Sequence, residues 1–378
     1  MKNAFIYTDR LAEFKYGEHH PLKPFRLKLT WELIKAIGLD KLDNTIYIEP
    51  KPADKAFVEK IHNYEYLDIL RTVNAGIDVP YASIFGLGYG DNPIFNGVYE
   101  WSMLVAGATL DATNLILNGE VKIAFNIAGG LHHALPNKAS GFCYINDCAV
   151  GIRYLLEKGK RVAYIDIDAH HGDGVQEIFY DNENVLKISI HESGYYLFPG
   201  KGFVEELGIG NGYGYSINIP LPPGSDDKVF HYAFDRVVHA YINKFEPDII
   251  VTQLGVDTLF HDPLAHLNLS IYGFADAVKK IKSFNLPWVA LGGGGYDIAS
   301  VAKAWTIAWA IMNDITLEDK IPEDYMKAYG SYGFEDDSLY GKRYEIENDV
   351  RQKLIKEVDR EIMFLEKNLN RIKGKHIR

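Results

Sequence analysis

Five short apolar runs recur through the middle and C-terminal parts of this 378-residue chain. They read VKIAFNIAGG, RVAYIDIDAH, NVLKISIHES, DIIVTQLGVD and PWVALGGGGY. Helix-like segments such as CAVGIRYLLEKGK and VFHYAFDRVVHAYINKF lie between them. Strands that are apolar along most of their length are typical of a parallel sheet covered by helices on both faces. The pattern therefore predicts a layered α/β fold.

Each of the five runs carries Gly, His or Asp at or near its carboxyl end. Taken alone, such an ending can be a turn glycine or the N-cap of a helix. In open α/β sheets, however, ligands bind beyond the carboxyl ends of the strands. The five endings together therefore predict one shared cleft.

The composition excludes several classes of protein. The formal net charge of −11 argues against a general nucleic-acid-binding surface, so we expect no direct nucleic-acid partner. No apolar run approaches the ~18 residues of a membrane span, and the start MKNAFIYTDR turns polar too early for a signal peptide. Cys143 and Cys148 form no CxxC pair. We expect a soluble, cytoplasmic protein.

No linker, repeat or low-complexity tract divides the chain, so we expect one domain over residues 1–378. The first ~100 residues read as mostly helical and looped. From about residue 344 an amphipathic helical extension is predicted. Because about three heptads are short for an independent coiled coil, we expect it to dock on the body or to make a helix contact in a homo-oligomer. Its apolar positions follow 3,4 spacing: Ile355, Val358, Ile362, Leu365, Leu369 and Ile372.

The stretch YIDIDAHHGDG predicts a metal site. Side chains alternate across a strand, so Asp166, Asp168 and His170 point to one side. Asp168 and His170 lie about 6.5 Å apart along the strand and can hold one ion between them. Asp257, at the tip of QLGVD, is a candidate third ligand, although an Asp there can equally cap a helix. Three ligands leave a coordination position open, as a catalytic site needs.

A two-metal site is the main rival. The arginase-like enzymes carry Asp-x-His-x-Asp on one strand and Asp-x-Asp on another. In this chain the additional positions are occupied by Gly172 on the first strand and by Gly255 and Leu259 on the second. None of these side chains can bind a metal, so a single ion is favoured.

Two further motifs place proton-transfer groups at strand tips. His132 and His133 in AGGLHHA are suited to acid–base chemistry near neutral pH, with Asp166 and Asp173 as partners for their second nitrogens. The four glycines of LGGGGYDI place Tyr296 where its phenol can donate to a developing oxyanion. The residues together predict a mononuclear metal hydrolase, in which the metal polarises a carbonyl and lowers the pKa of a bound water.

As a set, eight motifs resemble the zinc-dependent histone deacetylase family, including its class I-like bacterial and archaeal members of the acetoin-utilisation type. In order over residues 19 to about 306 they are HHPLKPFRL, GLGYGDNP, NIAGGLHHA, SGFCYINDCAVGI, YIDIDAHHGDGVQ, ISIHESGYYLFPG, QLGVDTL and LGGGGYDIASVAKAWT. The resemblance implies a single deacetylase domain with the three-layer arginase/deacetylase fold, a mainly parallel eight-stranded sheet between helices.

The resemblance also implies the roles of individual residues. Zinc ligands are Asp168, His170 and Asp257, and the catalytic group is His132, His133, Asp166, Asp173 and Tyr296. Substrate-binding residues are Asp91, Gly141, Phe142, Phe198 and Gly294, and Arg26 lies near an internal acetate pocket. By residue type alone we would place Phe142 and Phe198 in the core, and Asn92 departs from the cysteine common in eukaryotic members. Potassium is implied at Asp166, Asp168, His170, Ser189 and Ile190, and a second potassium near Phe179, Asn182, Val185 and Tyr215.

The expected reaction is hydrolysis of an acetylated amine, first of all acetyl-lysine in proteins. A small substrate such as an acetylpolyamine and a non-catalytic acetyl-lysine reader are the alternatives. The ligand set also suits Fe²⁺ in place of Zn²⁺. His171 should point away from the metal by alternation, and it is assigned no catalytic role.

Overall fold

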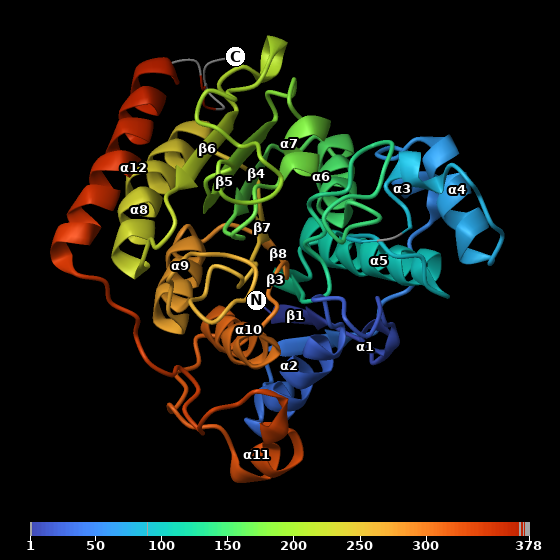
Figure 1. Ribbon diagram of the computed structural model, residues 1–378, viewed down its shortest axis with the longest axis horizontal. Helices are drawn as coiled ribbons and strands as arrows, with labels where there is room; N and C mark the ends of the chain where they lie inside the picture. Colours follow the sequence, from blue (N-terminus) through green and yellow to red (C-terminus); the bar gives the residue numbers. More distant parts are fainter. Residues whose placement is uncertain (1, 89, 370–371, 373, 375–378) are drawn as a thin grey trace.

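A computed structural model describes residues 2–88, 90–369, 372 and 374. Its centre is one eight-stranded sheet, in which the strands run in the order β2-β1-β3-β8-β7-β4-β5-β6. Every pair of neighbouring strands is parallel. Helices cover both faces (Figure 1). The three-layer arginase/deacetylase fold is therefore confirmed, with a sheet that is parallel throughout its described pairs.

The five predicted strands are all present. They are β3 (Val121–Asn126), β4 (Val162–Asp166), β5 (Val185–Glu192), β7 (Ile249–Gln253) and β8 (Trp288–Leu291). Three more were not identified from the apolar runs: β1 (Lys2–Ile6), β2 (Thr45–Ile48) and β6 (Ser216–Leu221). The description of the first ~100 residues as helical and looped was incomplete, because they also form two strands.

Two groups of helices sandwich the sheet (Figure 1). One group packs on β1, β3, β4, β7 and β8 and contains α5 (Val98–Leu117) and α6 (Asp147–Glu157), with α7 (Asp173–Ile178) beside α6. The other contains α2 (Phe25–Ala36), α8 (Asp227–Phe245), α9 (Ile271–Ser283), α10 (Ile298–Met312) and α12 (Asn348–Asn368).

Short helices connect these layers. They are α1 (Arg10–Glu13), α3 (Lys55–Val58), α4 (Tyr64–Asn74) and α11 (Glu323–Tyr329), with 3₁₀ turns at Leu39–Lys41, Ala82–Phe85, Gly210–Gly212 and Gly330–Tyr332. Among the helices that the structure describes, none combines the length and the apolar composition that crossing a membrane requires.

The sheet order places four strand ends side by side. β3, β8, β7 and β4 are consecutive neighbours, although they lie far apart in the sequence. Because they are parallel, their carboxyl ends meet at one edge of the sheet. The segments AGGLHHA, GGGGY, LGVD and DAHHGD follow these four ends. The fold therefore brings together the motifs from which the sequence predicts a cleft.

The C-terminal helix α12 docks on the body along α8 and β6. Its apolar side chains Val358, Ile362 and Leu365 are buried, as the docking interpretation requires. Near the start of α12, the Arg351 guanidinium donates to Asp226 Oδ2 from Nε (2.9 Å) and Nη2 (2.7 Å). Both side chains are buried, and Asp226 also caps α8 by accepting the Val229 N–H. This ion pair therefore joins α12 to the start of α8.

We predict that Arg351→Met lowers the free energy of unfolding by about 3 kcal/mol, because it leaves the buried carboxylate of Asp226 unpaired. Urea unfolding followed by circular dichroism measures the change. Arg236→Met is the matched control, because Arg236 pairs with Asp359 and Glu366 of the same helix at an exposed position. It should change the free energy by less than about 1 kcal/mol. Equal effects of the two variants would contradict this account.

Candidate active site

Asp168, His170 and Asp257 come together at the ends of β4 and β7. One ligand atom from each lies within 4.8 Å of the others, and all three side chains are buried. His170 Nδ1 lies 2.9 Å from Asp257 Oδ2 and 3.1 Å from Asp168 Oδ1. The structure thus forms the cluster that the sequence predicts from two segments 87 residues apart.

The chemistry of this cluster fits a bound divalent cation. Burial and the charge of Asp168 raise the pKa of Asp257, because two carboxylates in one buried place disfavour each other's ionised form. Burial alone would lower the pKa of His170, but its contacts with both carboxylates outweigh that effect and hold its pKa well above the usual value. A positive charge among the three groups relieves this repulsion. Two carboxylates and an imidazole are ligands that Zn²⁺ and Fe²⁺ accept.

Hydrogen bonds from the backbone and from Gln253 fix the two carboxylates. Asp168 Oδ2 accepts the Gly294 N–H at 2.7 Å and the Gln253 side-chain N–H at 2.5 Å. Asp257 Oδ1 accepts the Ala169 N–H at 2.8 Å. Such outer bonds orient ligands and tune their basicity. Gln253 ends β7 and was not identified from the sequence, because its contact with Asp168 depends on the pairing of β7 with β4.

Glycines surround the cluster where a side chain has no room. A Cβ at Gly294 would collide with the carboxylates of Asp257 and Asp168, and one at Gly255 with Asp168. A Cβ at Gly172 would lie 2.5 Å from Asp166 Oδ2. Gly172 and Gly255 are two of the positions where a two-metal site needs extra carboxylates. The packing therefore gives a physical reason why those ligands are absent.

His132 and His133 form a linked pair beside the cluster. Their Nε2 atoms lie 3.0 Å apart. His132 Nδ1 lies 2.8 Å from Asp166 Oδ2, and His133 Nδ1 lies 2.7 Å from Asp173 Oδ1. All four side chains are buried. Each imidazole therefore contacts, through its Nδ1 atom, one of the two carboxylates that were predicted as partners.

The surroundings separate the two histidines electrostatically. Burial disfavours a charged His132, but the charges of Asp166 and Asp168 outweigh it and raise its pKa to about 9. Burial and the neighbouring His132 lower the pKa of His133 to about 4, against the opposing effect of Asp173. Paired groups whose pKa values are pushed apart are typical of acid–base catalysis. These shifts favour a charged His132 beside a neutral His133.

Aromatic rings line the approach to these groups. The Phe198 ring packs on His133 with centroids 5.0 Å apart, and the Phe142 ring packs on Tyr296 at 5.6 Å. Phe198 is 41% exposed and Phe142 is partly buried, so the placement in the core that residue type suggests is wrong for Phe198. A Cβ at Gly141 would lie 2.5 Å from the His133 ring. The two rings therefore pack directly on His133 and Tyr296, and the backbone at Gly141 leaves no room for a side chain between the His133 and Phe198 rings.

The loop that carries Tyr296 is held from both sides. Asp262 Oδ2 accepts the Tyr296 N–H at 2.7 Å. The Arg26 guanidinium donates to the carbonyl oxygens of Gly295 (2.6 Å) and Gly293 (2.7 Å) and is buried. Arg26 lines an internal cavity together with His132 and Gly293. Asp262 was not identified from the sequence, because nothing in its neighbourhood distinguishes it from a turn residue.

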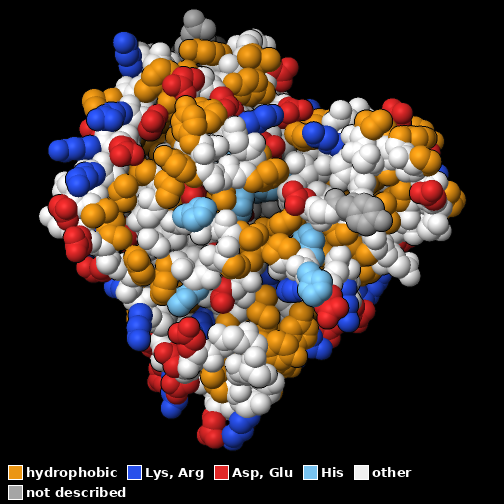
Figure 2. All heavy atoms as spheres, viewed as in Figure 1, with side chains coloured by type: hydrophobic (Ala, Val, Ile, Leu, Met, Phe, Trp, Pro, Cys, Tyr) orange, Lys and Arg blue, Asp and Glu red, His pale blue; other side chains and the backbone are white. Residues whose placement is uncertain are grey.

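At the surface, Asp91 is exposed, and its backbone oxygen lies 3.1 Å from His20 Nε2. The neighbouring Asn92 is buried and donates to the Cys143 carbonyl oxygen at 3.2 Å. The Asn92 side chain therefore joins the loop of Asp91 to the segment that carries Gly141 and Phe142. In Figure 2, histidine, acidic and hydrophobic side chains gather around a hollow near the centre of this face.

The remaining predicted residues lie on the neighbouring strand. Ser189 is the register partner of Asp166 in the β4–β5 pair, and Ile190 follows it, buried. Ser189 Oγ lies 2.8 Å from His191 Nδ1. His171 packs on the His191 ring, with centroids 4.8 Å apart, instead of joining the metal-ligand cluster. This packing agrees with the expectation that His171 points away from the metal.

Sequence reasoning also missed His62, which supports the histidine loop. Its Nδ1 lies 2.9 Å from the Leu135 carbonyl oxygen, and its Nε2 accepts the Asn146 N–H at 2.9 Å. The Asn146 side chain in turn donates to the carbonyl oxygens of His132 and Ala134. Burial lowers the pKa of His62 to about 4, so it stays neutral. No local pattern links His62 to a loop 70 residues later.

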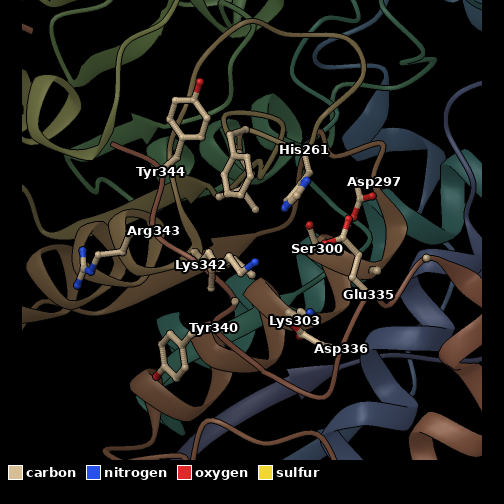
Figure 3. Close-up of a pocket in the computed structure, with 16 residues that line it drawn as sticks. His261, Asp297, Ser300, Lys303, Glu335, Asp336, Tyr340, Lys342, Arg343 and Tyr344 are labelled. Carbon is tan, nitrogen blue, oxygen red and sulfur yellow. Dashed lines mark hydrogen bonds between the residues drawn. The ribbon is translucent and has the colours of Figure 1, made fainter. Parts of the chain in front are cut away.

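A separate cavity of about 340 Å³ lies on the other side of the loops that carry Asp257 and Tyr296. Its walls come from the segments after β7 and β8, the start of α10 and the chain before α12. Figure 3 shows its side chains, which include His261, Ser300 and Lys303. None of the residues predicted to act in the site lines it, so it is not the place of the proposed chemistry.

Comparisons with known proteins agree with this geometry. The sequence model of the family described as "Histone deacetylase domain" matches residues 20–312. The chain is 36% identical to Histone deacetylase 19 of Arabidopsis thaliana, over 96% of this chain and 72% of that protein. It is 38% identical to the acetoin utilization protein AcuC of Bacillus subtilis, over 86% of this chain and 85% of that protein. A solved structure described as an HDAC homologue complexed with SAHA matches with a TM-score of 0.89 at 36% identity, covering 97% of this chain and 100% of the other.

We predict that Gly294→Ala loses most of the bound divalent metal, because the new methyl group meets the carboxylates of Asp257 and Asp168. Metal content per chain, measured by atomic emission after exhaustive dialysis and reloading, tests this. Gly330→Ala is the matched control, since its added Cβ meets only Met326 at an ordinary 3.5 Å. Full metal content in folded Gly294→Ala would contradict the assigned ligands.

Proposed function

This chain belongs to the histone deacetylase family, and on that premise we propose that it hydrolyses the acetyl amide of acetyl-lysine in proteins, releasing acetate and the free amine. The family is one of metal-dependent amide hydrolases. The observation that carries the proposal is the arrangement of three groups at one sheet edge. In the buried cluster of Asp168, His170 and Asp257, the His170 ring lies 5.9 Å from the His133 ring and 6.4 Å from the Tyr296 ring, measured between centroids.

Each group has a chemical task. Asp168, His170 and Asp257 would hold a divalent ion, which when bound would supply Lewis-acid chemistry at the acetyl carbonyl and at water. His133, neutral and oriented by Asp173, takes the proton from the attacking water. Charged His132, paired with Asp166, favours the negative charge that develops nearby.

The same histidine pair then returns a proton to the leaving amine, so that lysine departs as a neutral group. The Tyr296 hydroxyl donates a hydrogen bond to the developing oxyanion. Burial raises the pKa of Tyr296 well above its usual value, and the charges of Asp257 and Asp168 act in the same direction. Tyr296 therefore stays protonated and serves as a donor.

The passage between Phe142 and Phe198 suits the four-carbon stem of lysine, because two rings can flank a narrow aliphatic chain. In this proposal Gly141 and Gly294 border it, and the exposed Asp91 at the rim accepts hydrogen bonds from a substrate backbone. Such a main-chain contact favours a peptide over a small acetylated amine. In this proposal Arg26 lines the internal pocket through its hold on Gly293 and Gly295.

We assign Zn²⁺ to the metal site, with Fe²⁺ as the alternative that the same ligands accept. A potassium ion is assigned to the loop of Asp166, Asp168 and His170 and the adjacent Ser189 and Ile190, because Ser189 faces Asp166 in the sheet. A single domain over residues 1–378, the cytoplasmic location, the absence of a direct nucleic-acid partner and the homo-oligomer stay predictions.

We predict that the Zn²⁺-loaded protein releases acetate from an acetyl-lysine peptide, and that Tyr296→Phe and His133→Ala each lower kcat at least about 100-fold. A coupled acetate assay measures both. Tyr332→Phe, a Tyr→Phe change at an exposed position, is the control and should keep full activity.

The same assay with an acetylpolyamine tests the substrate class. A kcat/KM higher for the peptide supports the proposal. A higher value for the polyamine would assign a small-molecule deacetylase, and tight peptide binding without acetate release at full metal content would assign a reader.

A further inference from the structure

Lys187 is a buried lysine in the middle of β5. Its side chain is 4% exposed, and its Nζ donates to the Phe179 carbonyl oxygen at 2.5 Å. Lysine is almost never buried without a partner for its charge. Among the described residues, no carboxylate forms a salt bridge with it, and Asp181 acts only at longer range. The partner of this amine is therefore backbone carbonyl oxygen.

The Phe179 carbonyl oxygen lies at the end of a helix, where backbone groups favour a cation. Phe179 is the C-cap of α7, and the last carbonyl groups of a helix lack partners within the helix and favour positive charge. The following turn folds back on the same atom, because the Asn182 N–H donates to the Phe179 oxygen at 3.1 Å. The Lys187 N–H donates to the Tyr215 oxygen at 2.9 Å. Lys187 therefore donates from Nζ to a carbonyl group of this turn and from its backbone N–H to the carbonyl group of Tyr215, just before β6.

These groups coincide with the second potassium position implied by the family resemblance, which lies near Phe179, Asn182, Val185 and Tyr215. The residues do not fit an ion there, because an ion and Nζ would need the same oxygen of Phe179. The first potassium position differs. Ser189 follows Lys187 by two residues on the same face of β5, about 6.6 Å along the strand, and its hydroxyl contacts His191 and no amine of the described residues.

We propose that Lys187 Nζ permanently takes the place of a monovalent cation at the end of α7, so that this chain binds potassium at one position instead of two. The Lys187 ammonium group then holds the turn between α7 and β5. Because this group is covalently part of the chain, the contact does not depend on the potassium concentration of the solution. This inference goes beyond deacetylation and does not rest on it.

Crystals grown in Tl⁺ in place of K⁺ test the proposal directly, since the anomalous signal of Tl⁺ locates each bound ion. The wild type should show one Tl⁺ site, beside Ser189, and none against the Phe179 carbonyl group. Lys187→Thr, which removes the amine and places a residue favoured in strands at this position, should gain a second Tl⁺ site there. A Tl⁺ ion against Phe179 in the wild type would overturn the proposal, whether or not the variant folds.

Thermal unfolding gives the same test in solution without any measure of activity. Changing the buffer cation from N-methylglucamine to K⁺ should raise the Tm of Lys187→Thr by several degrees more than that of the wild type, because a ligand of the native state stabilises it. Lys122→Thr, a lysine change on β3, should respond as the wild type does. Equal responses of Lys187→Thr and the wild type would contradict the proposal.

Discussion

Two buried carboxylates share one small space with an imidazole, and this crowding of Asp168, Asp257 and His170 is the constraint on which the site depends. Like charges without solvent disfavour each other, so the fold must either neutralise them or hold a cation between them. The surrounding groups favour a cation held between the carboxylates. Backbone N–H groups of Ala169 and Gly294 fix the outer oxygens, and the inner oxygens face His170.

The parallel sheet brings the residues of this site together with short loops alone. Four neighbouring strands end at the same edge, so each contributes one short loop and none has to reach far. The loop after β4 supplies metal ligands and also the carboxylates that orient the histidines after β3. The loop after β8 places Gly294 against the ligands and Tyr296 above them. In the proposed function, one strand-end cluster thereby combines metal binding, proton transfer and oxyanion stabilisation.

The sequence predicted what depends on local pattern. Five strands are recognisable because each is an apolar run that ends in a turn residue, and the three candidate ligands follow from alternation and from position at a strand tip. β1, β2 and β6 were missed because they lack a continuous apolar run: β1 begins with Lys2 and Asn3, the residues of β2 are only partly buried, and β6 contains Asn218 and Pro220. Gln253, Asp262 and His62 were missed because their roles depend on which segments become neighbours in space. The roles of Asp91 and Arg26 came only from the family resemblance, and so did the placement of Phe198 outside the core.

The central claim is that one divalent ion is held by Asp168, His170 and Asp257. The most direct test is a crystal structure of the metal-loaded protein, with diffraction measured on both sides of the metal absorption edge. The account predicts a single anomalous peak in contact with these three side chains and no second peak within about 4 Å, the separation typical of two-metal sites. A second peak beside Gly172 or Gly255, or a single peak away from the three side chains, would contradict it.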